Sequence, residues 1–182
     1  MKLLKTIAAL FGGLVVVAIA SLWIAGFRKG AGHYEYAVDI NRPAADVWPW
    51  ITEPEKQKKW ISWLSEARTL TPDPFRVGSR EAWVMVDPGM NSQRIEIDSE
   101  VTSVVPNERL ELRVASRGMF SGDAAYRLTP LPGGGTRVLN YGDYRYDQWF
   151  SRLLEPLVSP EAQKKLKTDM GRLKALVEEG GR

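Results

Sequence analysis

The chain of 182 residues is long enough for one domain with a small appendage, and its 26% charged and 44% hydrophobic residues are typical of a globular protein. It has no cysteine and a single histidine, which excludes disulfides, thiol nucleophiles, cysteine zinc sites and multi-histidine metal sites within one chain. A serine–histidine triad could be built only around His33. Leaving out Lys2 and Lys5 reduces the formal net charge of +3 to a near-balance of 23 basic and 22 acidic residues, so no nucleic-acid-binding surface is expected.

The N-terminal part contains an uncharged run, residues 6–27, that is long enough to cross a bilayer as one helix. Lysines precede this run, and Arg28 and Lys29 follow it. A buried core helix would normally show a polar face, which this run lacks. The pattern predicts a cytoplasmic N-terminus over residues 1–5, a transmembrane helix over 6–27 and a short linker over 28–32.

A cleaved signal peptide is the alternative for this segment, because Ala18-Ile19-Ala20 is similar to a signal-peptidase site. The apolar run continues beyond this site to Trp23 and Phe27, which favours an anchor. The slight excess of positive charge on the N-terminal side predicts a single-pass protein of a bacterial inner membrane with its C-terminal domain exported.

The soluble part begins with residues 33–40, where apolar and polar side chains alternate as in a half-buried strand. An Asn-Arg-Pro sequence stops this strand, and Pro43 suits the first position of a helix. The apolar spacing that follows predicts a short helix that Pro49 makes brief or kinked. A second short helix is expected to end near Trp60.

A run of strands follows, with period-two alternation over residues 80–87, 94–104, 110–114, 126–128 and 136–146. Turn sequences separate these segments, among them Asp87-Pro88-Gly89 and Pro132-Gly133-Gly134-Gly135. Polar and apolar faces that alternate between short turns predict an antiparallel sheet with one face exposed to water and one buried.

The C-terminal segment is predicted to be helical. Its apolar stripe consists of Ala162, Leu166, Met170, Leu173 and Val177. Prolines at 156 and 160 interrupt the preceding turns, and Ser159-Pro160-Glu161 predicts a break and a restart of the helix. A sheet and a helix with one apolar face each bury these faces against one another, so the expected class is α+β, an antiparallel sheet wrapped around a long C-terminal helix.

Several motifs of the soluble part follow one another in a distinctive order: residues 38–51 with a Trp-Pro-Trp run, Trp60, Val77-Gly78, Gly135 to Val138, and Leu173 to Glu178. Together they resemble the START-like superfamily, which includes polyketide cyclase/dehydrase and lipid-transport proteins, over residues 33–180. The resemblance implies the helix-grip fold, a seven-stranded sheet around a C-terminal helix, with a cavity between them that holds a hydrophobic ligand. It transfers no catalytic residues, because the superfamily has no universal set.

The candidate ligand-binding residues are large side chains expected on the inner face, because small-molecule pockets are mostly apolar with a few polar groups. They are Trp60, Trp63, Trp83, Met85, Tyr126, Tyr144, Met170 and Leu173. Ordinary core packing is the alternative for each of them. No catalytic residue, cofactor or metal site is predicted.

The leading functional hypothesis is a membrane-anchored domain that binds a hydrophobic or lipid-like small molecule without catalysis. One alternative is an enzyme similar to polyketide cyclases and dehydratases, which would need an acid–base group within the cavity. Another is an envelope module that interacts with a protein partner of unknown identity. These hypotheses differ in what the cavity contains.

Overall fold

The computed structural model describes residues 2–27, 31–72, 75–87 and 93–180. Residues 28–30 of the expected linker, and Pro88 and Gly89 of a predicted turn, lie outside the described residues. The elements follow one another as α1 (Lys2–Gly26), β1 (His33–Ile40), α2 (Ala44–Thr52), α3 (Pro54–Trp60), β2 (Leu64–Thr69), β3 (Arg80–Asp87), β4 (Gln93–Val105), β5 (Arg109–Ser116), β6 (Phe120–Pro130), β7 (Thr136–Tyr146) and α4 (Trp149–Glu179).

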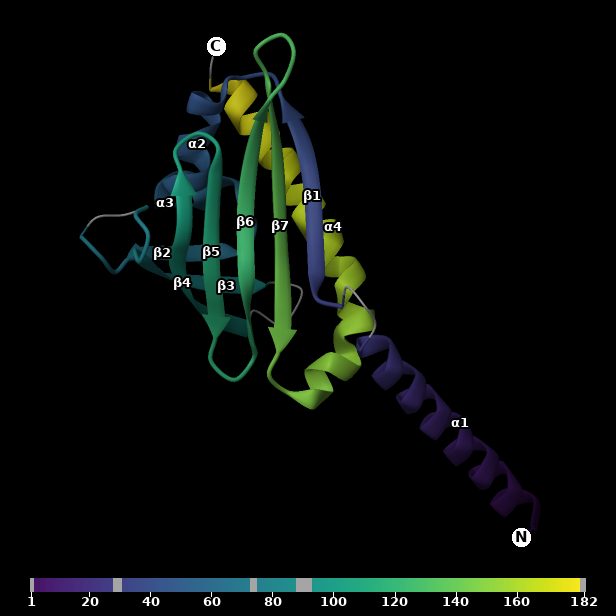
Figure 1. Ribbon diagram of the computed structural model, residues 1–182. Helices are drawn as coiled ribbons and strands as arrows, with labels where there is room; N and C mark the ends of the chain where they lie inside the picture. The colour runs from purple at the N-terminus through teal and green to yellow at the C-terminus, as the bar shows by residue number, and fades with distance from the viewer. Residues whose placement is uncertain (1, 28–30, 73–74, 88–92, 181–182) are drawn as a thin grey trace.

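The strands form one seven-stranded antiparallel sheet in the order β1-β7-β6-β5-β4-β3-β2. The first strand pairs with the last, with Val38 opposite Val138, and every other pairing is between strands consecutive in the chain. The sheet curves around α4, which runs along its inner side (Figure 1). This arrangement is the predicted α+β helix-grip fold.

One strand, β2, has no counterpart among the segments predicted from alternation. It lies at the edge of the sheet, and its register against β3 shifts between Leu64 and Glu66. An edge strand with a register shift does not keep strict period two, so its sequence pattern is weak.

The predicted break in the C-terminal helix is wrong. α4 is one helix of 31 residues, with Pro156 and Pro160 inside it. A proline inside a helix removes one hydrogen bond and displaces the preceding turn, which kinks a helix that is held by other contacts. Figure 1 shows this as a bend between the first turns of α4 and the longer part under the sheet.

The densely packed end of the interior lies where β1 ends and α2 begins. Ile40, Val47, Ile51, Val138 and Leu173 are fully buried there in one core cluster. The burial of these aliphatic side chains, each stabilising by about 1.5–3 kcal/mol, holds α2 and the C-terminal part of α4 to the sheet.

The N-terminal helix α1 extends away from the domain (Figure 1). It contains a segment, Lys5–Gly26, that is long and apolar enough to cross a membrane, and none of the apolar window in it is buried. A signal sequence can meet the same criteria of length and composition, whereas the core helix of a soluble protein is mostly buried. The exposure of α1 therefore fits a membrane span or a signal sequence better than a core helix.

Candidate functional site

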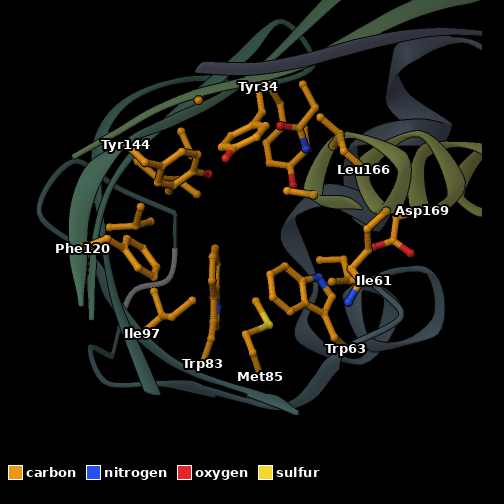
Figure 2. A pocket seen from close by; sticks show the side chains of 18 of the residues that line it. Tyr34, Ile61, Trp63, Trp83, Met85, Ile97, Phe120, Tyr144, Leu166 and Asp169 are labelled. Atoms are coloured by element: carbon orange, nitrogen blue, oxygen red, sulfur yellow. The ribbon is translucent and has the colours of Figure 1, made fainter. Parts of the chain in front are cut away.

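A cavity of about 290 Å³ lies between the concave face of the sheet and α4. Figure 2 shows the side chains that surround its open centre. Cavities that bind small molecules begin at about 300 Å³, so this one has the size of a small ligand site. Its wall combines six strands, α3 with the turn that follows it, and α4.

Strand periodicity explains how these side chains meet. Alternate residues of a strand point to the same face, so Trp83 and Met85 of β3 share the inner face, and so do Tyr144 and Tyr146 of β7. Tyr34, near the start of β1, joins them because β1 pairs with β7. The result is a wall made mainly of aromatic rings.

Small residues in the sheet leave the space open. Ala124 and Gly142 are paired across β6 and β7, and both border the cavity. A Cβ atom on Gly142 would lie 2.7–2.9 Å from the ring and hydroxyl of Tyr144, so only glycine lets that ring lie over the strand. The ring also packs edge-on against Phe120, with 5.7 Å between the centroids. Tyr144 therefore covers the sheet without filling the centre.

The polar groups of the wall are mainly tyrosine hydroxyls. The hydroxyl oxygens of Tyr34 and Tyr146 lie 3.0 Å apart in a hydrogen bond. Burial raises the pKa of Tyr144 to about 12, and it also raises the pKa of Tyr126. The hydroxyls of Tyr144 and Tyr126 stay protonated at neutral pH, so they can donate to and accept from a polar group of a bound molecule.

Charged side chains lie at the α4 side of the wall. The carboxylate of Asp169 accepts a hydrogen bond from the backbone N–H of Ser62 at 3.1 Å, and in Figure 2 it is turned away from the open centre. Burial raises the pKa of Asp169, and the hydrogen bond from Ser62 opposes this shift. The Lys165 ammonium lies 4.8 Å from the centroid of the Trp63 ring. Both groups are therefore engaged by other parts of the protein.

A comparison with known proteins identifies the family of the chain that forms this cavity. Residues 31–178 match the model of the family described as polyketide cyclase / dehydrase and lipid transport. The chain belongs to this family. No curated protein matches the sequence.

Solved structures share the fold of this polyketide cyclase/dehydrase and lipid-transport domain. NE0264 from Nitrosomonas europaea is 20% identical with a TM-score of 0.63, over 84% of this chain and 98% of that one. CV1439 from Chromobacterium violaceum is 19% identical with a TM-score of 0.62, over 80% and 97%. DynU16, a protein in the dynemicin biosynthetic locus, is 19% identical with a TM-score of 0.60, over 82% of this chain and 48% of DynU16.

The structure brings six of the eight candidate residues together around the cavity of this family member: Trp60, Trp63, Trp83, Met85, Tyr126 and Tyr144. Met170 and Leu173 are not among the lining residues and belong to the packed core, because α4 carries them past the cavity toward α2. Contact of any of these side chains with a ligand stays a prediction.

Several lining residues were missed from the sequence. Tyr34 and Tyr146 lie within the alternation predicted over residues 33–40 and 136–146, so treating the ends of these strands as candidates would have found them. Asn140 and Ala124 carry no such signal, because a polar or small residue on an inner face looks like an interruption of the pattern. Their importance comes from the space that surrounds them.

Other titratable groups lie outside the cavity of this family member. His33 Nδ1 is 2.8 Å from Asp143 Oδ1 on the exposed side of β1 and β7, and this hydrogen bond raises the pKa of His33. Glu81 is buried and accepts a hydrogen bond from the Trp83 indole at 2.9 Å. Within the part of the chain that the structure describes, no cluster of three His, Asp or Glu side chains could hold a metal ion.

Proposed function

We propose that this protein binds a hydrophobic or lipid-like small molecule in the cavity between the sheet and α4 and does not transform it. The observation that supports this most directly is the wall itself, in which aromatic and aliphatic side chains surround a space with few polar groups. Burying an apolar ligand there gains about 25 cal/mol per Å² of apolar surface removed from water.

The tyrosine hydroxyls give the ligand class a second feature. Tyr34 and Tyr146 are hydrogen-bonded to each other, and either hydroxyl can also bind a carbonyl or hydroxyl group of a guest. An amphipathic molecule with one neutral polar group and an apolar body matches this wall better than a pure hydrocarbon or an ion.

The same groups support binding over catalysis. General acid–base catalysis is most efficient when the pKa of the catalytic group is near the working pH. The pKa of Tyr144 is about 12, so this hydroxyl is not tuned to exchange protons with a guest near pH 7. The Asp169 carboxylate accepts a hydrogen bond from the Ser62 N–H and is turned away from the open centre (Figure 2).

The exposed apolar helix α1 supports the role of an anchor in this proposal. With α1 in the inner membrane and the domain exported, the cavity stays close to a bilayer that dissolves its ligands. A cavity next to the bilayer suits a molecule that is scarce in water.

The test uses three versions of the full chain purified in detergent: wild type, Ala124→Trp and Asp123→Trp. Ala124 borders the cavity, so a tryptophan there fills it. Asp123 is the exposed neighbour on the other face of β6, so its replacement adds the same ring outside. Circular dichroism first confirms that all three are folded. Mass spectrometry of solvent extracts then identifies what each carries.

A compound enriched in the extracts of wild type and Asp123→Trp, and depleted with Ala124→Trp, is the expected result. Identical extracts from all three chains would refute binding in the cavity. A compound that the wild type alters covalently on incubation would favour the cyclase/dehydratase-like alternative, and folded chains without any enriched compound would favour the interaction module.

A further inference from the structure

In the first turns of α4 a carboxylate is buried and large apolar side chains are exposed, which is the reverse of a surface helix in a soluble protein. The carboxylate-bearing Glu155 is 1% exposed, whereas Trp149 is 67% and Leu157 59% exposed. The large apolar side chains on the outside of residues 149–158 are Trp149, Phe150, Leu154, Leu157 and Val158. A contiguous exposed apolar surface of this kind marks an interaction site.

The polar side chains of this segment hold it in that orientation. Glu155 accepts a hydrogen bond from the backbone N–H of Gly32 at 3.2 Å. Arg152 Nε donates to the backbone oxygen of Tyr146 at 3.2 Å. These contacts join the inner side of the segment to the start of β1 and to the end of β7, so the apolar side chains are held outward.

The same segment packs against the domain end of α1. A Cβ atom on Gly26 would lie 2.1 Å from the backbone oxygen of Arg152, so the two helices approach as closely as glycine permits. The Arg152 guanidinium lies 5.5 Å from the centroid of the Phe27 ring. In Figure 1 the first turns of α4 run across the direction of α1 at this end.

We infer that residues 149–158, the interfacial segment, lie in the surface of the lipid bilayer beside α1. This rests on the anchoring role of α1 in the proposed function. A helix that spans a bilayer ends at the headgroup level, so a segment packed across that end lies at the same depth. Tryptophan, phenylalanine and leucine on the outer face, with arginine beside them, are the composition of helices that lie in the interface.

The inference also specifies what the cavity faces. Val158 and Ala162 are exposed and line the cavity, so its α4 wall is continuous with the interfacial segment. Tyr34 and Tyr146 come from the strand ends nearest the same helices. The end of the domain that holds the cavity therefore faces lipid, and a ligand can pass between bilayer and cavity over a short apolar path.

The test measures the membrane depth of single spin labels, which the chain allows because it has no cysteine. The variants are Val16→Cys in α1, Leu157→Cys in the interfacial segment and Val77→Cys before β3. All three replaced side chains are more than half exposed, at 66%, 59% and 69%, so the label disturbs each site equally little. Leu154→Cys provides a second position in the segment should Leu157→Cys fail to fold.

The full chain is reconstituted in phosphatidylcholine–phosphatidylglycerol vesicles, and collisions of each label with oxygen and with a water-soluble nickel chelate are compared. Labels at 16 and 157 should collide mainly with oxygen, and the label at 77 mainly with nickel. A label at 16 in lipid with labels at 157 and 154 in water would overturn the interfacial segment alone. A label at 16 in water would overturn the anchor, and the segment with it.

Discussion

The two ends of the interior are built from the same strands and the same helix, yet one is packed and the other is hollow. Ile40 and Val138 lie at the packed end and Tyr34 and Tyr144 at the hollow end, within the same two paired strands. At the packed end α2 adds aliphatic side chains that fill the space under the sheet. At the hollow end the Tyr144 ring lies over Gly142, and the centre stays open. A core and a cavity thus differ in what stands opposite each inward residue.

The largest expected effect is a difference in stability between two alanine substitutions in α4, one at each end of the interior. Leu173→Ala should lower the free energy of unfolding by about 2–5 kcal/mol, because it opens a void in a packed core. Leu166→Ala should cost less, since Leu166 borders the cavity and has fewer neighbours to lose. Urea unfolding of the full chain in detergent, followed by circular dichroism, measures both. Equal losses would mean that the two ends are packed alike.

A second variant breaks the link between α4 and the first strand. Glu155→Ala should lower the free energy of unfolding by about 1–3 kcal/mol, because the Gly32 N–H loses its buried acceptor. Glu155→Gln keeps an acceptor oxygen and should retain most of the stability. Thermal unfolding of both variants measures this, and equal losses would show that the hydrogen bond has no part in holding the hollow end.

The carboxyl group of Asp169, which borders the cavity, should make the free energy of unfolding depend on pH. Burial raises the pKa of Asp169 above its usual 3.8, so the folded state keeps this proton to a higher pH than the unfolded state does. The contribution of Asp169 to stability therefore falls as the pH rises from 3.8 through the folded value. Asp169→Asn keeps an acceptor for Ser62 and removes this fall. Melting temperatures at pH 4 and pH 7 measure it, and an unchanged difference between the two pH values in the variant would contradict it.

The smallest effect concerns the exposed face of the hollow end. The hydrogen bond to Asp143 raises the pKa of His33, so this pair stabilises the fold below about pH 6.5 and loses its effect as the pH rises through the folded value. Asp143→Asn should return the pKa of His33 toward 6.5. Because His33 is the single histidine, one ring signal in an NMR titration reports it. An unshifted titration curve in the variant would exclude the pair as the cause.

Much of the fold could be predicted because alternation survives wherever a strand has one buried face. The predicted bounds of β1, β3 and β7 agree with the structure, whereas the irregular edge strand β2 was missed. The break expected at Pro156 and Pro160 was wrong because local proline rules do not include the contacts of Glu155 and Arg152. The contact of Glu155 joins α4 to Gly32, which is far away in the chain, so no local pattern records it.

The sequence by itself determined the helix-grip fold and the inner face of its regular strands, and six of the eight candidate residues line the cavity. Only the tertiary structure decided that Met170 and Leu173 meet other side chains while Trp83 and Tyr144 meet open space. Periodicity specifies on which face of its strand or helix a residue lies, and this is a property of that element alone. Whether that face meets a neighbour depends on side chains from other elements across the interior, and on how closely the bend of α4 brings them.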